Sequence, residues 1–517
     1  MQRRPAGARM PLRAIVAPGI LRAGAAALRF PVRRWCAAEG AGGAERALDV
    51  GGKRDKFSPR SPAPAGAMGR AVSPCGRSST AAAGRVSSSL KDAEIVLETL
   101  TQSPQLSLAK DKIRVLLLEG VNETGVQLMQ DAGYTNVTRL TKALDGAALK
   151  EAIKGVHILG IRSRTHITAE VLEAADRLMA VGCFSVGTNQ VDIDACRSHG
   201  IPVFNAPFSN TRSVAELVIG EIVMLLRRIP DRSHAAHEGK WDKSATDSHE
   251  VRGKTLGIVG YGNIGTQLSI LAEAMGMRVI FYDLVDKLRH GNSEPKANLA
   301  DLLAQSDVVT LHVPETAATQ GMIGRAEIAA MKPGSYLINN SRGKVVDLEA
   351  LADALKAGKL RGAAIDVFPV EPGSNVERFT SPLQGLGNVI LSPHVGGSTE
   401  EAQERIGSEV ARKLVDYSDT GSTVGAVNFP QVQLPARPMG TRFIQVHRNL
   451  AGMLGRLNEV LARHKVNIAA QYLETYVDIG YVVLDADTSA ADSQKVLAEI
   501  RALEGTIRAR LLYEYRT

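Results

Sequence analysis

An arginine, a glutamate and a histidine follow three predicted strands in the second half of the sequence. Arg342 lies in NNSRG, Glu371 in IDVFPVEP and His394 in SPH. Ligands bind at the carboxyl ends of the strands in an open parallel sheet. An anion clamp, a base and a carboxylate that holds the base form the minimal set for oxidising a hydroxy acid. Alone, each residue would more often be surface charge or packed structure, but together they predict a catalytic site.

A glycine-rich loop follows the predicted strand Thr255–Gly260 and precedes a helix. Its residues are Gly260, Tyr261, Gly262, Asn263, Ile264 and Gly265. Such glycines let the backbone turn tightly and approach a pyrophosphate, which the helix N-terminus then binds. Asp283 ends the next predicted strand, 23 residues after Gly260, where a carboxylate accepts from ribose hydroxyls and repels a 2′-phosphate. This predicts NAD rather than NADP; the alternative is a glycine turn beside a solvated aspartate.

Two arginines lie in the segment RSRTH, which ends an early predicted strand. Alternation along a strand puts Arg162 and Arg164 on the same face, and two adjacent guanidinium groups suit a phosphate. Solvated surface charge is the alternative. The polar loop 205–212 (NAPFSNTR) follows a further strand and is of a kind that can line a cleft.

From Lys112 onward, apolar runs of strand length alternate with amphipathic helices, the pattern of parallel βαβ units. The helix Val214–Arg228 is apolar nearly all round and is expected between layers, and the helix Thr399–Ser418 follows the last strand of this part. We expect strands at Ile113–Glu119, His157–Arg162, Met179–Val186, Pro202–Phe204, Thr255–Gly260, Arg278–Asp283, Asp307–Val313, Ser335–Asn340, Ala363–Val367 and Val389–Leu391.

The last part of the chain has a different order of elements. The Pro-rich segment Phe429–Gly440 predicts a linker. Beyond it we expect a ferredoxin-like βαββαβ unit, which is too small to repeat the chemistry of the body and therefore indicates a regulatory or assembly module. Its expected elements are Arg442–His447, Met453–His464, Ala469–Tyr476, Gly480–Ala486, Ala491–Glu504 and Thr506–Tyr513.

The expected fold class is α/β, with two doubly wound, Rossmann-like domains and the ferredoxin-like unit. We expect a disordered leader at 1–108 and a nucleotide domain at 210–396. The substrate domain is expected at 109–209 and 397–437, because the helix Thr399–Ser418 has to cross back. The C-terminal unit is expected at 438–517.

Composition agrees with a soluble globular protein. Of 517 residues, 44% are apolar and 22% charged, and no stretch approaches the roughly 18 apolar residues of a membrane span. The cysteines at 36, 75, 183 and 196 form no C-x-x-C pair. We therefore expect no disulfide framework, no metal site and a reducing compartment.

The net charge of +8 belongs to the leader. Residues 1–90 carry 14 Arg and 2 Lys against 4 acidic residues, so the other 427 residues are mildly acidic. We expect no nucleic-acid partner. The acid-free segment Leu12–Arg34 suits an organellar transit peptide; the alternative is a start of translation further down. The expected compartment is the cytoplasm, or an organelle if the leader is a transit peptide.

The motifs between about Lys110 and Tyr513 resemble the bacterial-type D-3-phosphoglycerate dehydrogenases, a branch of the D-2-hydroxyacid dehydrogenase family with a C-terminal ACT (small-molecule regulatory) domain. The motifs that carry the resemblance are RSRTH, VGCFSVGTNQVDID, FNAPFSNTRSVAELVIGE, GIVGYGNIGTQ, NNSRGKVVDLEAL, GAAIDVFPVEP, SPHVGGSTEEAQ, AVNFP and VNIAAQYLET.

The resemblance implies a role for particular residues. Arg342 would bind the substrate carboxylate and C2 oxygen, and His394, held by Glu371, would be the general acid–base. Arg162 and Ser163 would bind the distal phosphate end of 3-phosphoglycerate, Asn210 would contact the substrate, and Arg164 is a further substrate-binding candidate. The NAD site would be lined by Gly260, Gly262, Asn263, Ile264, Gly265, Asp283, Asn340, Ser341, Arg342, Asp366, His394, Val395, Gly396 and Gly397. Serine, as a regulatory ligand, would be bound by His447, Asn449 and Asn467.

The sequence departs from the family pattern at two places. Thr141 stands where a lysine is usual, with Arg139 and Lys142 nearby, so one phosphate contact is in doubt. HRNLAGML lacks the usual proline before its glycine, which puts serine sensitivity in doubt.

Two other functions compete with this hypothesis. One is a related enzyme acting on glyoxylate, hydroxypyruvate or 2-hydroxyglutarate, against which the paired arginines and the ACT-like unit argue; 2-oxoglutarate stays open as a side substrate. The other is a non-catalytic NAD-sensing scaffold, against which the set Arg342, Glu371 and His394 argues.

An isolated ACT unit usually pairs with a second copy, so we expect a homo-oligomer, a tetramer, with a further isologous contact between nucleotide domains. Serine is expected to act through hinges near Val395–Thr399 and Phe429–Gly440.

Overall fold

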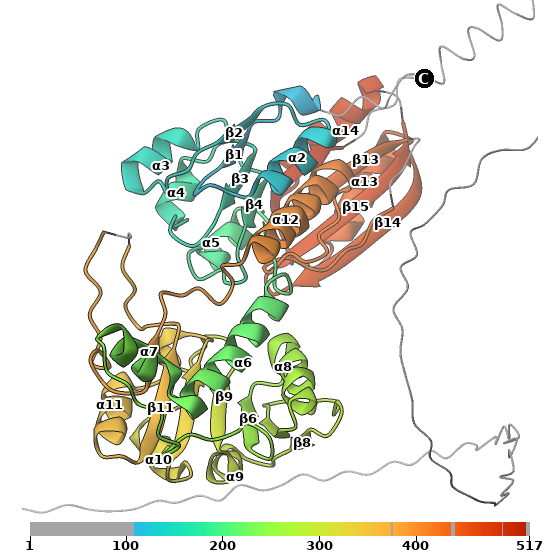
Figure 1. Ribbon diagram of the computed structural model, residues 1–517. Helices are drawn as coiled ribbons and strands as arrows, with labels where there is room; N and C mark the ends of the chain where they lie inside the picture. The colour runs from blue at the N-terminus through green and yellow to red at the C-terminus, as the bar shows by residue number, and fades with distance from the viewer. Residues whose placement is uncertain (1–107, 374–375, 436–439, 489, 513–517) are drawn as a thin grey trace, which may run out of the picture. The chain divides into compact units, whose positions relative to one another are not determined.

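The computed structural model describes residues 108–373, 376–435, 440–488 and 490–512. Within these residues, the strands form three sheets of five, seven and four strands (Figure 1). The predictions for the leader, with Cys36 and Cys75, lie outside them. Two parallel sheets and one antiparallel C-terminal sheet confirm the predicted fold class.

The five-stranded sheet is parallel, in the order β2-β1-β3-β4-β5. Strands β1, β3, β4 and β5 are buried throughout, as expected for a parallel sheet with both faces covered. The strands are Val115–Leu117 (β1), Val137–Arg139 (β2), Ile158–Ile161 (β3), Ala180–Cys183 (β4) and Val203–Phe204 (β5). The helices of this part are Lys110–Lys112 (η1), Glu123–Asp131 (α2), Gly146–Ala152 (α3), Ala169–Glu173 (α4) and Ile193–Ser198 (α5).

The seven-stranded sheet is also parallel, in the order β12-β11-β10-β9-β6-β7-β8. Its strands are Thr255–Val259 (β6), Arg278–Tyr282 (β7), Glu294–Pro295 (β8), Val308–Leu311 (β9), Ser335–Asn339 (β10), Leu360–Ile365 (β11) and Val389–Leu391 (β12). Its helices are Thr211–Arg227 (α6), Ile229–His237 (α7), Asn263–Ala274 (α8), Leu299–Gln305 (α9), Arg325–Ala330 (α10), Gly343–Val345 (η2) and Leu348–Lys356 (α11).

Two short edge strands, β2 and β8, were not expected from the sequence. The first reads VTR and is largely exposed, and the second is a two-residue pair. Neither has a buried apolar run, because an edge strand has a neighbour on one side only. Sequence periodicity therefore does not distinguish them from loops.

Helix α6 packs on α8, β10, β11 and β12. Val218 and Ile222 on its inner face are buried, whereas Ile219 and Val223 on its other face are only half-buried. The all-round apolar character is thus not matched by all-round burial within the single chain.

Helix α12 (Glu400–Thr420) returns to the five-stranded sheet, where it packs on α2, β4 and β5. The approach to α2 is close, since a Cβ on Gly125 would lie 2.9 Å from the carbonyl oxygen of Gly407. Near its end, Asp419 accepts from Tyr134 and Lys110 at 2.6 Å each. The helix therefore joins this part of the fold although its sequence follows the seven-stranded sheet.

The C-terminal sheet is antiparallel, in the order β14-β15-β13-β16. Its elements confirm the predicted βαββαβ order. They are Thr441–Arg448 (β13), Met453–Arg463 (α13), Asn467–Tyr476 (β14), Ile479–Asp487 (β15), Ala490–Ala502 (α14) and Thr506–Leu511 (β16).

The start of the Pro-rich segment is packed rather than exposed, which corrects its interpretation as a linker. Phe429, Val432 and Leu434 are buried in one apolar cluster with Ile444 and Tyr481 of the C-terminal sheet. Apolar side chains at three of six positions favour burial over a solvated tether. Residues 436–439 of this segment lie outside the described residues.

A buried arginine of the C-terminal sheet contacts the end of α12. Arg442 donates to both carboxylate oxygens of Asp485, at 2.6 and 2.8 Å, and to the carbonyl oxygens of Thr420 and Pro435. The guanidinium is completely buried, and a buried charge needs such partners to offset its desolvation.

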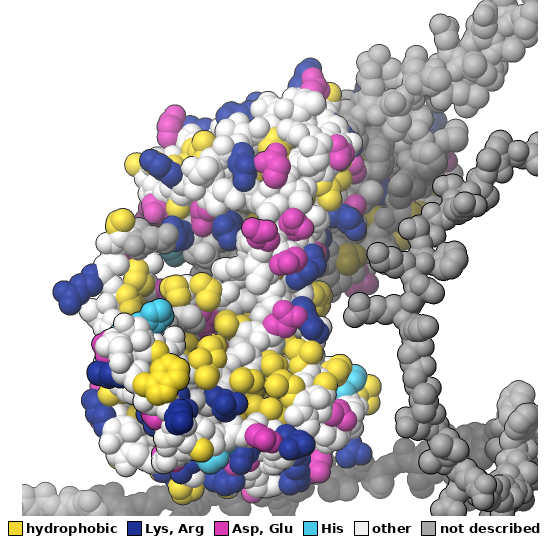
Figure 2. Space-filling view, in the orientation of Figure 1, with side chains coloured by type: hydrophobic (Ala, Val, Ile, Leu, Met, Phe, Trp, Pro, Cys, Tyr) yellow, Lys and Arg dark blue, Asp and Glu magenta, His cyan; other side chains and the backbone are white. Residues whose placement is uncertain are grey.

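The surface mixes acidic and basic side chains, and hydrophobic side chains gather over the seven-stranded sheet and its helices (Figure 2). Among the described residues no helix is long and apolar enough to cross a membrane. Cys183 and Cys196 are both buried free thiols.

Candidate active site

The predicted catalytic and nucleotide-binding residues lie along one edge of the seven-stranded sheet. Strands β6 and β9 pair directly, so the order of the chain reverses between them, and ligands bind at such switch points in doubly wound sheets. After the ends of β6 and β7 come Gly260, Gly262, Asn263, Ile264, Gly265 and Asp283; after the ends of β10, β11 and β12 come Asn340, Ser341, Arg342, Asp366, Glu371, His394, Val395, Gly396 and Gly397.

His394 and Glu371 are in direct contact. Nδ1 of His394 lies 2.9 Å from Oε2 of Glu371, and the N–H of Phe368 donates to the other carboxylate oxygen at 3.1 Å. Both side chains are partly exposed. Because the carboxylate holds Nδ1, the imidazole presents Nε2 for exchanging a proton with a ligand.

The backbone at His394 is strained and is held by Asp366. His394 has a φ of 55°, in the left-handed region that non-glycine residues rarely adopt. The carboxylate of Asp366 accepts from the N–H groups of Val395 and Gly396, at 2.8 Å each, and its carbonyl oxygen accepts from the N–H of His394. These bonds stabilise a conformation that otherwise costs energy, as is common at functional sites.

The contact between His394 and Glu371 shifts the pKa of each side chain in the direction that favours its charged form. The hydrogen bond that Glu371 accepts from His394 raises the pKa of His394 above its usual range, against the lowering effect of burial. Burial acts to raise the pKa of Glu371, but its contacts with His394, the Phe368 N–H and the charge of Arg342 outweigh burial and lower that pKa. A protonated imidazole is therefore stabilised beside this carboxylate.

Arg342 is presented by a tight turn after β10. The side-chain amide of Asn339 donates to the carbonyl oxygen of Arg342 at 3.0 Å and accepts from the N–H and hydroxyl of Ser341. Burial lowers the pKa of Arg342 from its ordinary value, while Glu315 and Glu371 raise it. A partly desolvated guanidinium binds a carboxylate more strongly than a solvated one does.

Glu221, in the middle of α6, is a buried acid that the sequence analysis did not single out. It is completely buried, and its Oε2 accepts from the side-chain amide of Asn340 at 2.9 Å. Burial raises the pKa of Glu221 to about 8, with the charge of Asp366 adding to the effect and the Asn340 bond opposing it. Glu221 is therefore mostly protonated at neutral pH.

A protonated Glu221 also accounts for two unpaired oxygens. Among the described residues, Oε1 of Glu221 and Oδ1 of Asn340 have no hydrogen-bond partner. A neutral carboxylic acid can donate from Oε1 while it accepts at Oε2. A two-way acid–amide pair would satisfy both groups and hold the turn that carries Arg342.

The glycine loop has the shape that a dinucleotide requires. Gly260 has a φ of 91°, and a Cβ there would lie 2.4 Å from the carbonyl oxygen of His312. A Cβ on Gly265 would lie 2.4 Å from the carbonyl oxygen of Gly260, whereas one on Gly262 would meet nothing within 4 Å. The first and third glycines thus allow close packing, and the second leaves room beside the N-terminus of α8.

These residues fit an NAD molecule. Asp283 follows β7, where its carboxylate accepts from the Tyr261 N–H at 2.8 Å and is still partly exposed for ribose hydroxyls. A hollow of about 610 Å³ beside the loop is lined by Phe208, Thr211, Asn263, Thr266, Gln267, Ile270 and His290. Among the described residues, no group of three or more His, Cys, Asp or Glu side chains could hold a metal ion.

The predicted phosphate-binding residues follow β3 in the other parallel sheet. Arg162 donates to Oε1 of Gln403, on α12, at 2.7 Å, and Gln403 donates to the carbonyl oxygen of Gly397 at 3.0 Å. Burial lowers the pKa of Arg162, the charge of Glu119 raises it and that of Arg164 lowers it further. Gln403 thus links the predicted phosphate residue to the segment that carries His394, a connection that no sequence motif indicated.

Two further predicted positions lie close to this region. Asn210 precedes α6, and its side-chain nitrogen lies 2.8 Å from where a Cβ on Gly397 would be. Thr141, at the usual lysine position, is exposed, and its Cα lies 3.9 Å from where a Cβ on Gly120 would be. Its hydroxyl cannot replace an ammonium charge.

The predicted serine-binding residues are not brought together within one chain. His447 and Asn449 lie at one end of the C-terminal sheet, where His447 pairs with Gly480 of β15. Asn467 pairs with Asp487, seven residues further along the same strand, or roughly 20 Å away at the rise of a β-strand. His447 is buried and its Nε2 has no partner among the described residues, whereas Asn449 and Asn467 are exposed.

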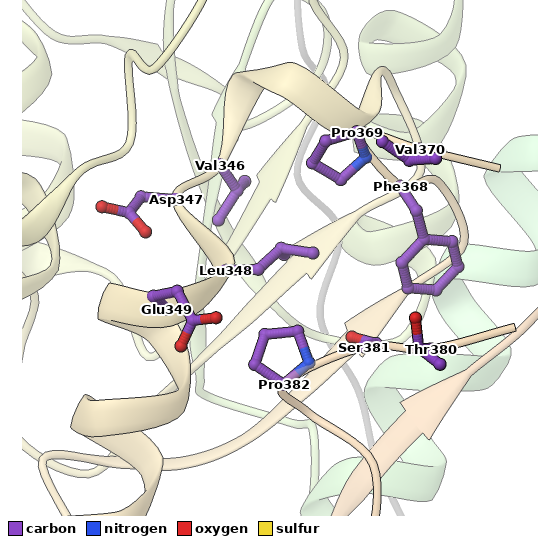
Figure 3. Close-up of a pocket in the computed structure, with 10 residues that line it drawn as sticks. All are labelled: Val346, Asp347, Leu348, Glu349, Phe368, Pro369, Val370, Thr380, Ser381 and Pro382. Atoms are coloured by element: carbon purple, nitrogen blue, oxygen red, sulfur yellow. The ribbon is translucent and has the colours of Figure 1, made fainter.

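A separate cavity of about 350 Å³ lies beside the start of α11 (Figure 3). It contains none of the predicted site residues, although Phe368 and Pro369 precede Glu371 in the chain. Its lining consists of Val346, Asp347, Leu348, Glu349, Phe368, Pro369, Val370, Thr380, Ser381 and Pro382.

Comparison with known families matches two parts of the chain. Residues 219–396 match the NAD-binding domain of D-isomer specific 2-hydroxyacid dehydrogenases, and residues 443–508 match an ACT domain like that of the AHAS small subunit. These segments contain the seven-stranded sheet and most of the C-terminal sheet.

Similar proteins match about four fifths of the chain. The D-3-phosphoglycerate dehydrogenases of Haemophilus influenzae and Escherichia coli K12 are each 57% identical over 409 residues, 79% of this chain and 99% and 100% of theirs. That of Dictyostelium discoideum is 47% identical over 410 residues, 79% of this chain and 100% of its own.

Among solved structures, D-lactate dehydrogenase from Aquifex aeolicus, complexed with NAD and lactic acid, has a TM-score of 0.55 at 29% identity. It covers 62% of this chain and 100% of its own.

We predict that Glu221→Gln changes how stability depends on pH. Because the pKa of Glu221 is raised to about 8 in the folded protein, the folded state keeps a proton that the unfolded state releases above about pH 4.5. Wild-type stability should therefore fall as the pH rises from about 4.5 to 8. The glutamine has no proton to release and can still accept from Asn340, so it should remove this loss, on the order of a few kcal/mol. Thermal unfolding from pH 5 to 9 measures the effect. Glu216→Gln, an exposed change on α6, is the control, and a constant difference between wild type and Glu221→Gln would contradict the prediction.

We also predict that Glu371→Gln shifts the pH dependence of hydroxy-acid oxidation. Without the carboxylate, the pKa of His394 should fall, so the neutral base forms at lower pH. The rising limb of kcat/KM should then move to lower pH, and kcat should fall because the imidazolium loses its partner. Glu349→Gln, an exposed carboxyl on α11, is the control; an unmoved limb would show that Glu371 does not act on His394.

Proposed function

Because this chain belongs to the D-3-phosphoglycerate dehydrogenase family of the D-isomer specific 2-hydroxyacid dehydrogenases, we propose that it oxidises D-3-phosphoglycerate to 3-phosphohydroxypyruvate, the first step of the phosphorylated route to serine. The chain is an NAD-dependent dehydrogenase. The observation that carries the proposal is the 2.9 Å contact between His394 and Glu371, with Arg342 beside it, at the switch point of the NAD-binding sheet.

The proposed mechanism uses three side chains. Arg342 binds the substrate carboxylate and C2 oxygen and so orients C2. Nε2 of His394 accepts the proton of the C2 hydroxyl, and Glu371 stabilises the resulting imidazolium. NAD, when bound, accepts the hydride that leaves C2.

The residues proposed to bind the distal end of the substrate favour a phosphorylated compound. Arg162, Ser163 and Arg164 follow β3 together, and Arg162 is linked through Gln403 to the segment that carries His394. Two guanidinium groups suit a dianionic phosphate better than an uncharged hydroxymethyl group. A distal carboxylate can also bind such a clamp, which makes 2-oxoglutarate the second candidate substrate.

We propose that the protein is a homo-oligomer, a tetramer, in which ACT domains pair. The separation of His447 and Asn467 within one chain supports pairing, because a twofold contact can bring His447 of one copy to Asn467 of the other. The half-buried apolar face of α6 supports a second contact between nucleotide domains.

Serine is the proposed effector of the paired ACT domains. Asn449 and Asn467 offer polar groups for its carboxylate, ammonium and hydroxyl, and His447 offers a ring nitrogen. The burial of Phe429, Val432 and Leu434 favours transmission through the packed contact with α12 over a free hinge there. Val395–Thr399 stays the proposed hinge, since Gly396 and Gly397 lie within it.

The proposed compartment is the cytoplasm, or an organelle if the leader acts as a transit peptide. Mass spectrometry of the N-terminus of the mature protein distinguishes the two.

We predict that purified protein forms NADH with D-3-phosphoglycerate and that His394→Ala lowers kcat by about a hundredfold or more, the usual effect of losing a general base. NAD affinity, measured by fluorescence titration, should be largely kept. His199→Ala, an exposed histidine after α5, is the control. A near-normal kcat in His394→Ala would refute the assignment of the base, and wild-type protein that binds NAD but oxidises no hydroxy acid would favour the scaffold hypothesis.

We predict that millimolar serine inhibits the enzyme and that His447→Ala and Asn467→Ala each abolish inhibition. Co-expression of the two variants should restore part of it, because one site in each mixed pair combines two unaltered faces. Sedimentation of a monomer at micromolar concentration, or mixed oligomers that stay insensitive while wild type responds, would contradict the paired site.

A further inference from the structure

We propose that Glu119 is a positioning residue for recognition of the phosphorylated end of the substrate, through the loop Arg162–Thr165 that it holds. This inference rests on the proposed function, because it concerns the same substrate site. Glu119 does not itself bind the substrate in this proposal.

The carboxylate of Glu119 accepts four consecutive backbone N–H groups. Oε1 accepts from Arg162 at 3.1 Å and Thr165 at 2.9 Å. Oε2 accepts from Ser163 at 3.1 Å and Arg164 at 2.9 Å. Both oxygens are thus used, and one side chain fixes the path of the whole segment.

The order of the strands explains how Glu119 reaches this loop. Strand β1 pairs with β3, and the N–H of Leu118 continues that ladder to the carbonyl oxygen of Gly160. Beyond it, Glu119 and Gly120 both adopt left-handed conformations, with φ of 61° and 63°. A left-handed backbone conformation is unusual for glutamate and must be stabilised by the contacts of the residue. The four hydrogen bonds of the Glu119 side chain are such contacts.

Four successive N–H groups that point to one spot form a site for an anion. In this protein a carboxylate of the chain itself occupies that site, so the backbone is not left for the phosphate. Recognition of the phosphate then falls to the side chains of Arg162, Ser163 and Arg164. The directions in which these side chains leave the loop are set by the backbone that Glu119 holds.

Glu119 also acts on the charge of the loop. Its carboxylate opposes the effect of burial, which lowers the pKa of Arg162. Arg162 is fixed from two other sides as well, because its carbonyl oxygen accepts from Gln190 and its guanidinium donates to Gln403. Loss of Glu119 should therefore loosen the loop while these two anchors keep it near the site.

The test compares Glu119→Gln with Glu123→Gln, a matched change of an exposed glutamate at the start of α2. The glutamine keeps the size of the side chain, but its NH₂ group would face two N–H donors, so two of the four bonds cannot form. KM and kcat are measured for reduction of 3-phosphohydroxypyruvate and of hydroxypyruvate, which lacks the phosphate.

We expect Glu119→Gln to raise KM for 3-phosphohydroxypyruvate by about tenfold or more, the scale of losing hydrogen bonds to a charged acceptor. KM for hydroxypyruvate should stay within about twofold, NADH affinity should be unchanged, and Glu123→Gln should match wild type. Glu119→Asp, which keeps the charge on a shorter arm, should give an intermediate KM.

Three results would overturn the role of Glu119. The first is an unchanged KM for the phosphorylated substrate, and the second is an equal loss for both substrates in a folded variant that binds NADH normally. The third applies if Glu119→Gln does not fold. In that case, a folded Glu119→Asp that raises KM equally for both substrates would overturn the role. A wild-type enzyme that prefers hydroxypyruvate would instead refute the proposed substrate.

Discussion

The backbone N–H groups of loops that follow parallel strands need hydrogen-bond acceptors. Around the site of this protein, side-chain carboxylates are those acceptors. Asp366 accepts from Val395 and Gly396, and Glu119 accepts from all four residues of the loop after β3. An unpaired buried N–H costs about as much as a lost hydrogen bond. Hydrogen bonds from these N–H groups to charged carboxylates fix the loops that present His394 and the proposed phosphate-binding arginines.

The environment of each ionisable group sets its protonation. Glu371 contacts His394 and stays charged, whereas Glu221 is completely buried in α6, and burial raises its pKa to about 8. The same contrast separates two histidines. Contact with Glu371 raises the pKa of His394, while burial alone lowers the pKa of His312 to about 3. One sheet edge thus holds a titrating base and a neutral supporting acid.

The C-terminal sheet is packed on the first part of the fold through an apolar cluster and the hydrogen bonds of buried Arg442. Arg442 contacts Asp485 in its own sheet and the carbonyl oxygen of Thr420 at the end of α12. Helix α12 also carries Gln403, which contacts Arg162. A displacement of the C-terminal sheet would therefore act on a helix that touches the proposed phosphate-binding residues, which offers the proposed regulation by serine a physical path.

The sequence alone determined the kinds of element, the fold class and the strand ends that carry Arg342, Glu371, His394 and the glycine loop, because periodicity and local motifs report the environment of each residue along its own strand or helix. Only the tertiary structure decided which strand ends are neighbours. Glu119 meets the loop after β3 because β1 and β3 pair, Glu221 meets Asn340 because α6 crosses the sheet, and the register of β15 separates His447 from Asn467. The Pro-rich segment likewise looked like a tether until Phe429 proved to be buried in a core contributed by distant parts of the chain. Such contacts arise from packing between elements far apart in the sequence, and a local sequence pattern does not report which distant elements pack together.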